Sequence, residues 1–70
     1  MKIKTYYVEH TISRDYVTFK SLKKAVEYSI QKKNEMLIIH VGGWNLDGYN
    51  KGDTFETLYN RCKKYLAEIK

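Results

Sequence analysis

The residues with the greatest potential for chemistry lie in one short segment, which contains every glycine and the only tryptophan of the chain. Counted from Asn45 as position 1, Asp47, Asp53 and Glu56 fall where an EF-hand loop places calcium ligands. Position 6 of such a loop must be glycine, and here it is Asn50. We therefore expect no metal, and we interpret Asp53 and Glu56 as the N-terminal capping pair of a helix.

The same segment has the order of a phosphate-binding loop, because Gly42 and Gly43 follow an apolar run and precede a helix. It lacks the Gly-Lys-Ser/Thr sequence of such loops, and the carboxylate of Asp53 would repel a phosphate at the helix N-terminus. The glycines are better explained by a sharp turn at the end of a strand. We expect no cofactor.

Nucleophilic catalysis would require Cys62 together with His10 or His40. Cys62 stands between Leu58 and Leu66 on the apolar stripe of a helix, where a cysteine is usually a buried structural residue. A single histidine within a strand is more often a packing or surface residue than a catalytic one. With no paired carboxylates of suggestive spacing either, we expect no catalytic residues and a protein that is not an enzyme.

Binding to a partner is the remaining role for the glycine-rich segment, because loops held on rigid elements often carry binding residues. Its candidate contact residues are Trp44, Asn45, Asp47, Tyr49 and Lys51. A domain this small has a small core, so it cannot easily bury both Trp44 and Tyr49. Either Trp44 is an exposed anchor for a partner, or it folds back onto the core and leaves Tyr49 exposed.

Around this segment, hydrophobic periodicity predicts the secondary structure. Runs rich in β-branched and aromatic residues indicate strands at 2–11, 16–20 and 36–41. One amphipathic helix is expected after the N-cap Ser21, ending near 33–34, and a second from Asp53 to the C-terminus. Residues 1–70 should form a single α+β domain in the order β-β-α-β-α.

A right-handed crossover between the second and third strands sets the expected sheet. The first strand should lie in the middle of a three-stranded sheet of order 2-1-3, with both helices on one face. The other face would then be open, and alternation directs Tyr16 and His40 towards it. We expect Tyr7, Tyr16 and His40, with the basic residues Lys4 and Arg14, to form a second candidate binding surface.

The charge of the chain leaves two classes of partner open. Thirteen Lys and Arg against eight Asp and Glu give a net charge of +5, which favours acidic partners at long range. Tyrosines on an open sheet face can stack on single-stranded nucleic acid, and they are equally suited to anchor a protein interface. A nucleic-acid-binding module is therefore the alternative to a protein-binding one.

Other features concern location and origin. The N-terminal residues do not resemble a signal peptide and no run is long enough to span a membrane, so we expect a cytoplasmic protein without membrane contact. In its short length and its content of Lys, Tyr, Ile and Asn, the chain resembles small accessory proteins of phages and mobile elements. That resemblance implies a protein that binds a bacterial protein and inhibits or redirects it. A homodimer is left open.

Overall fold

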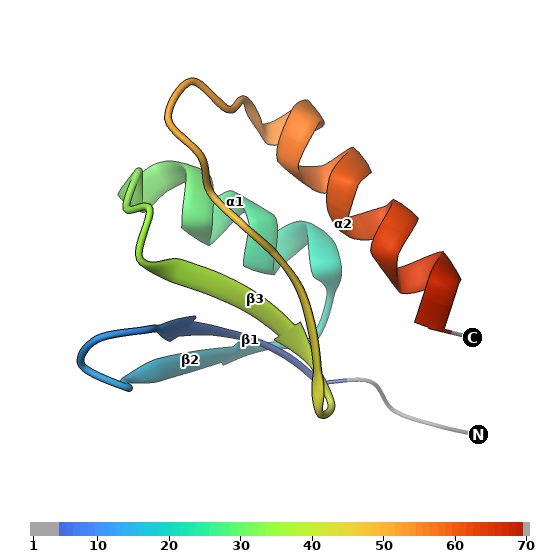
Figure 1. Ribbon diagram of the computed structural model, residues 1–70, viewed down its shortest axis with the longest axis horizontal. Helices are drawn as coiled ribbons and strands as arrows, with labels where there is room; N and C mark the ends of the chain where they lie inside the picture. The colour runs from blue at the N-terminus through green and yellow to red at the C-terminus, as the bar shows by residue number, and fades with distance from the viewer. Residues whose placement is uncertain (1–4, 70) are drawn as a thin grey trace.

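The computed structural model describes residues 5–69, in which two helices pack on one antiparallel sheet (Figure 1). The elements follow the order β-β-α-β-β-α. Their bounds are β1 (Tyr6–His10), β2 (Tyr16–Phe19), α1 (Leu22–Lys32), β3 (Leu37–Val41), β4 (Trp44–Gly48) and α2 (Phe55–Ile69).

The sheet has the strand order β2-β1-β3-β4, and every neighbouring pair is antiparallel. The predicted order 2-1-3 holds for the first three strands, but the prediction of three strands was wrong. Residues expected to form a loop instead pair with β3 as β4. The turn between them is Gly42–Gly43, and Gly42 has a left-handed φ of 60°, as two-residue hairpin turns require.

A bulge shapes this fourth strand. The pairing of β3 with β4 shifts between Ile39 and His40, so that Leu46 is an extra residue, and its side chain is buried in the core. At Gly48 a Cβ atom would lie 2.6 Å from the carbonyl oxygen of Leu37. Only glycine can therefore bring β4 this close to the start of β3.

Helix α1 begins as predicted, because the side chain of Ser21 accepts a hydrogen bond from the backbone N–H of Lys24 at 3.3 Å. It ends at Lys32, next to the predicted end at 33–34. Lys33 takes the left-handed conformation, with φ 50°, and its N–H donates to the carbonyl of Ser29.

Helix α2 is capped differently from the prediction. Thr54 and Thr57 cap it reciprocally: each backbone N–H donates to the other residue's hydroxyl oxygen, at 2.9 and 3.3 Å. The proposed pair of Asp53 and Glu56 does not form, because the carboxylate of Asp53 is engaged by Arg61 instead.

The core lies between the sheet and the helices, where the alternate residues of β1 and β3 meet the apolar stripes of α1 and α2. Along α2 the burial is less extensive than the periodicity predicts. Leu58 and Cys62 are fully buried, Leu66 is half-buried, and Tyr65 is exposed rather than part of the core. The fully enclosed apolar residues include Val8, Ala25, Val26, Ile39, Leu58 and Cys62.

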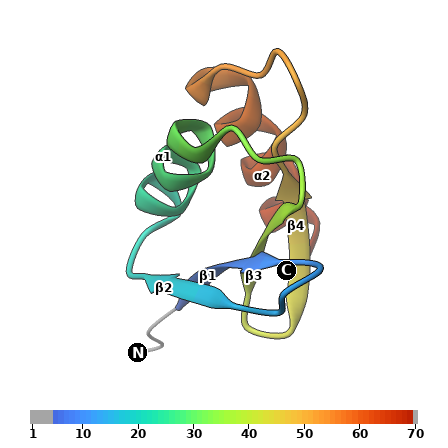
Figure 2. The same ribbon diagram turned by 90° about the vertical axis from the view of Figure 1, so that its left-hand side faces the viewer.

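Both helices lie on the same side of the sheet, as predicted (Figure 2). Helix α1 packs over β1, β2 and β3, whereas α2 packs against β4 and α1. Within residues 5–69 no helix or strand covers the opposite side of the sheet. This open face is where the candidate binding surface lies.

Candidate binding surface

Three aromatic rings form a row across the open face, and we call Tyr16, Tyr7 and His40 the aromatic row. Tyr7 of β1 lies directly opposite His40 of β3, and the two rings stack with their centroids 4.8 Å apart and their planes 8° apart. On the other side Tyr16 of β2 meets Tyr7 at 5.7 Å with a tilt of 59°. Tyr7 and His40 face away from the helices because their neighbours along β1 and β3 are buried in the core, and Tyr16 shares their face because it pairs with Glu9, two residues after Tyr7.

The central ring of the row is fixed at both its face and its tip. The hydroxyl of Tyr7 donates to the carbonyl oxygen of Gly42 at 2.8 Å, so the ring spans from β1 to the β3–β4 turn. A ring held this way has little freedom to lose when a partner binds, and such pre-organisation favours affinity. The centre of the aromatic row is therefore held in place by the fold.

Acidic and basic groups beside the row compensate one another. Nε2 of His40 lies 3.0 Å from Oε1 of Glu9, although it makes no hydrogen bond of good geometry to the described residues. The other carboxylate oxygen of Glu9 lies 3.6 Å from the guanidinium of Arg14. Lys4, the other predicted cation of this face, lies outside the described residues. The described cation Arg14 is thus paired with a carboxylate.

Tyr16, at one end of the row, is exposed and retains 64% of its surface. Trp44, just after the Gly42–Gly43 turn, retains 59%, but it pairs with the buried Val41 and so projects to the helix side of the sheet. Asn45 is also exposed and lies opposite His40 in the β3–β4 pairing. A shallow hollow lined by Thr5, Tyr7, Tyr16 and Thr18 lies beside the row.

The structure divides the predicted loop site. Asn45 pairs with His40 and so lies on the open face, whereas Trp44 pairs with the buried Val41 and so projects to the helix side. Tyr49 is only 7% exposed and belongs to the core, so the alternative of a buried Trp44 with an exposed Tyr49 is wrong. Lys51 lies beyond β4, where its backbone N–H donates to the carboxylate of Glu35 at 2.9 Å.

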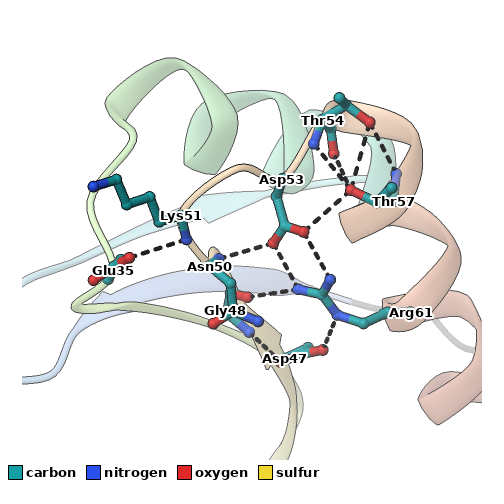
Figure 3. Close-up of polar contacts among 9 residues, drawn as sticks. All are labelled: Glu35, Asp47, Gly48, Asn50, Lys51, Asp53, Thr54, Thr57 and Arg61. Atoms are coloured by element: carbon teal, nitrogen blue, oxygen red, sulfur yellow. Dashed lines mark hydrogen bonds and ion pairs between the residues drawn. The ribbon is translucent and has the colours of Figure 1, made fainter.

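Asp47 belongs to a polar network centred on Arg61 of α2 (Figure 3). Nε of Arg61 donates to Asp47 at 2.7 Å, and its two terminal nitrogens donate to the two oxygens of Asp53 at 2.8 and 2.7 Å. One of those nitrogens also donates to the carbonyl of Gly48 at 3.1 Å. The network connects β4, the loop after it and α2, so Asp47 and Asp53 have a clear structural role.

The electrostatics of this network follow from its hydrogen bonds. The bidentate bond from Arg61, more than any other contact, holds the pKa of Asp53 well below its ordinary value. The same bonds raise the pKa of Arg61. Sequence reasoning overlooked Arg61, although the signal was present: Asp53, Thr57 and Arg61 are spaced four residues apart, which places them on one side of α2.

Cys62 and His10, which were considered for catalysis, lie in environments that give them structural roles. Cys62 is fully buried, and this burial raises the pKa of its thiol to about 12, so little thiolate forms near neutral pH. Nδ1 of His10 accepts hydrogen bonds from the backbone N–H groups of Ile12 and Ser13 and so stabilises the β1–β2 turn. Among residues 5–69 no three His, Cys, Asp or Glu side chains gather in a way that could hold a metal ion.

No helix of the described chain is both long and apolar enough to cross a membrane. Comparisons of this chain with protein-family models, with curated proteins and with solved structures find no match.

Proposed function

We propose that this chain is a small non-enzymatic binding protein that recognises another protein through its open sheet face. One observation carries the proposal: Tyr16 is 64% exposed at the end of the row of contacting rings on the open face. Tyr and Trp are the residue types most enriched at the energetic centres of protein interfaces. Exposed large aromatics lower solubility, and contact with a partner explains why this surface keeps them.

The surroundings of the chemically reactive groups also favour binding over catalysis. The one thiol is buried, and the carboxylates of Asp47 and Asp53 are both held by hydrogen bonds to the same guanidinium. The grooves on the surface are shallow and open, so none of them encloses a substrate away from water. The surface supplies contact area rather than a set of reacting groups.

The composition suggests the kind of partner. Because the chain resembles small accessory proteins of phages and mobile elements, we propose that its target is a bacterial protein in the cytoplasm, which it inhibits or redirects. Inhibition requires only that a rigid surface occupy a site on the target. A row of contacting rings that ends in an exposed tyrosine is suited to this task.

Nucleic-acid binding through the same face is the weaker alternative. Arg14 is paired with Glu9, and one side of the Tyr7 ring is covered by His40. A single strand needs both an excess of positive charge and free ring faces on which bases can stack. Most of the lysines in the described chain lie on the helices instead, at Lys23, Lys24, Lys32, Lys63 and Lys64.

A pull-down from a bacterial lysate, with and without nuclease, separates the two classes of partner. We expect the chain to retain a specific protein after nuclease treatment, because the contact is made by aromatic side chains and not through phosphates. Loss of every captured protein on nuclease treatment would contradict the proposal. In that case, binding to a single-stranded oligonucleotide should weaken steeply with salt, as phosphate contacts do.

A further inference from the structure

The two edges of the sheet differ in how their backbone groups are satisfied. At the β4 edge the chain protects itself, since the N–H of Gly48 donates to the Asp47 carboxylate at 2.7 Å and its carbonyl accepts from Arg61. The bulge further disrupts the regularity of this strand. Bulges and covering side chains are ordinary means of preventing contact between sheet edges.

Strand β2, at the other edge, has none of these protections (Figure 1). Its residues Tyr16–Phe19 include no charged side chain, and the chain contains no proline. Besides Tyr16, Val17 is exposed, at 41%. An unprotected edge strand with exposed apolar side chains is a template for pairing with another strand.

The hydrogen-bond pattern shows which backbone groups are free to pair. The N–H of His10 donates to the carbonyl of Asp15 at 2.8 Å, which makes these two residues a hydrogen-bonded pair. Hydrogen-bonded pairs alternate along an antiparallel ladder, so Val8 and Val17 form the next one. The backbone groups of Tyr16 and Thr18 must therefore point outward, away from β1.

We propose that two copies of this chain form a dimer by pairing their β2 strands antiparallel, with Val17 on the two-fold axis. In this register Tyr16 of each copy lies opposite Thr18 of the second copy, and both outward pairs exchange their N–H and C=O bonds. Paired residues also project to the same face, since Tyr16 and Thr18 are both on the open side. The edge is therefore complementary to itself, which is what a two-fold interface requires.

Space for the second copy is present on the helix side. A groove lined by Val17, Tyr28, Lys32 and Leu37 opens between β2 and the C-terminal half of α1. Because only two residues separate β2 from α1, the antiparallel register places the start of the second copy's α1 next to this groove. The two Val17 side chains then cover each other on this side of the sheet.

The dimer would join two open faces into one surface. Each face contributes its aromatic row, and the Tyr16 end of each row lies at the interface. A partner with two equivalent sites would gain avidity from this arrangement, because the second contact is made within the same complex. The dimer itself stands independently of any partner and can be tested with the purified chain.

Sedimentation equilibrium of the purified chain tests the proposal. We expect a concentration-dependent dimer for the parent, and a monomer for Val17→Lys at the same concentrations, because two lysines would meet on the axis. The matched control Tyr65→Lys changes an exposed aromatic residue on α2 and should leave the dimer intact. Circular dichroism checks that both variants are folded. A parent that stays monomeric at its highest soluble concentration, or a dimer that survives Val17→Lys, overturns the proposal.

Oxidative cross-linking tests the register. Residues of a non-hydrogen-bonded antiparallel pair are close enough for a disulfide, so Val17→Cys should form a covalent dimer readily. The native Cys62 is fully buried and adds little background. Ile12→Cys, which is highly exposed in the β1–β2 turn, is the control and should cross-link far less. Equal cross-linking of the two variants would contradict the pairing.

Discussion

Replacing Leu58 with alanine should lower the free energy of unfolding by about 2–5 kcal/mol, the usual range for a fully enclosed leucine. Leu58 has no exposed surface and belongs to the cluster that joins α2 to the sheet. For a domain of this size such a loss is a large fraction of the total stability. Chemical denaturation followed by circular dichroism measures it.

Leu66→Ala is the internal comparison. It removes the same type of side chain about two turns further along the same face of α2, where leucine is only half-buried. We expect a clearly smaller effect there. If Leu66→Ala costs as much as Leu58→Ala, the C-terminal half of α2 packs more tightly than the structure shows.

Replacing Arg61 with alanine should cost about 2–3 kcal/mol, since it leaves two carboxylates close together without a counter-charge. The expected loss of stability is smaller than for a fully buried ion pair, because a third of the Arg61 side chain is exposed. Arg61→Lys should recover only part of the loss, because lysine lacks the bidentate geometry. Lys63→Ala, a neighbouring exposed site on the same helix, is the control and should change little.

The same network predicts the acid dependence of stability. The pKa of Asp53 is lowered in the folded chain, so its contribution is complete above the unfolded value of about 3.9 and is lost as the pH falls below it. Asp53→Asn should therefore be less stable than the parent at neutral pH and should lose less stability between pH 5 and pH 2. Parallel pH curves for the two proteins would show that Asp53 is not held by Arg61 in solution.

Much of the scaffold could be predicted from local patterns. The apolar stripes defined both helices, Ser21 marked the start of α1, and the crossover rule gave the order of the first three strands. Alternation along the strands also placed Tyr16 and His40 on the open face. These features depend on periodicity and on short-range hydrogen bonds, which the sequence encodes directly.

The fourth strand was missed because its residues have weak β-propensity. Asn45, Asp47 and Gly48 are typical of loops, yet pairing with β3 holds them extended. The two consecutive glycines before Trp44 were the available signal for a hairpin. Once β4 forms, Tyr49 is drawn into the core and Asp47 meets Arg61, contacts that only the tertiary structure determines.

Binding of the captured partner by the variant Tyr16→Ala tests the central claim most directly. If this ring anchors the interface, the affinity should fall about 10-fold or more, the scale expected when one such anchor is removed. The melting temperature should change little, because the side chain is mostly exposed. Tyr65→Ala, an exposed aromatic on α2, should bind as the parent does. A folded Tyr16→Ala variant that keeps the parent's affinity would show that the open sheet face is not the binding surface.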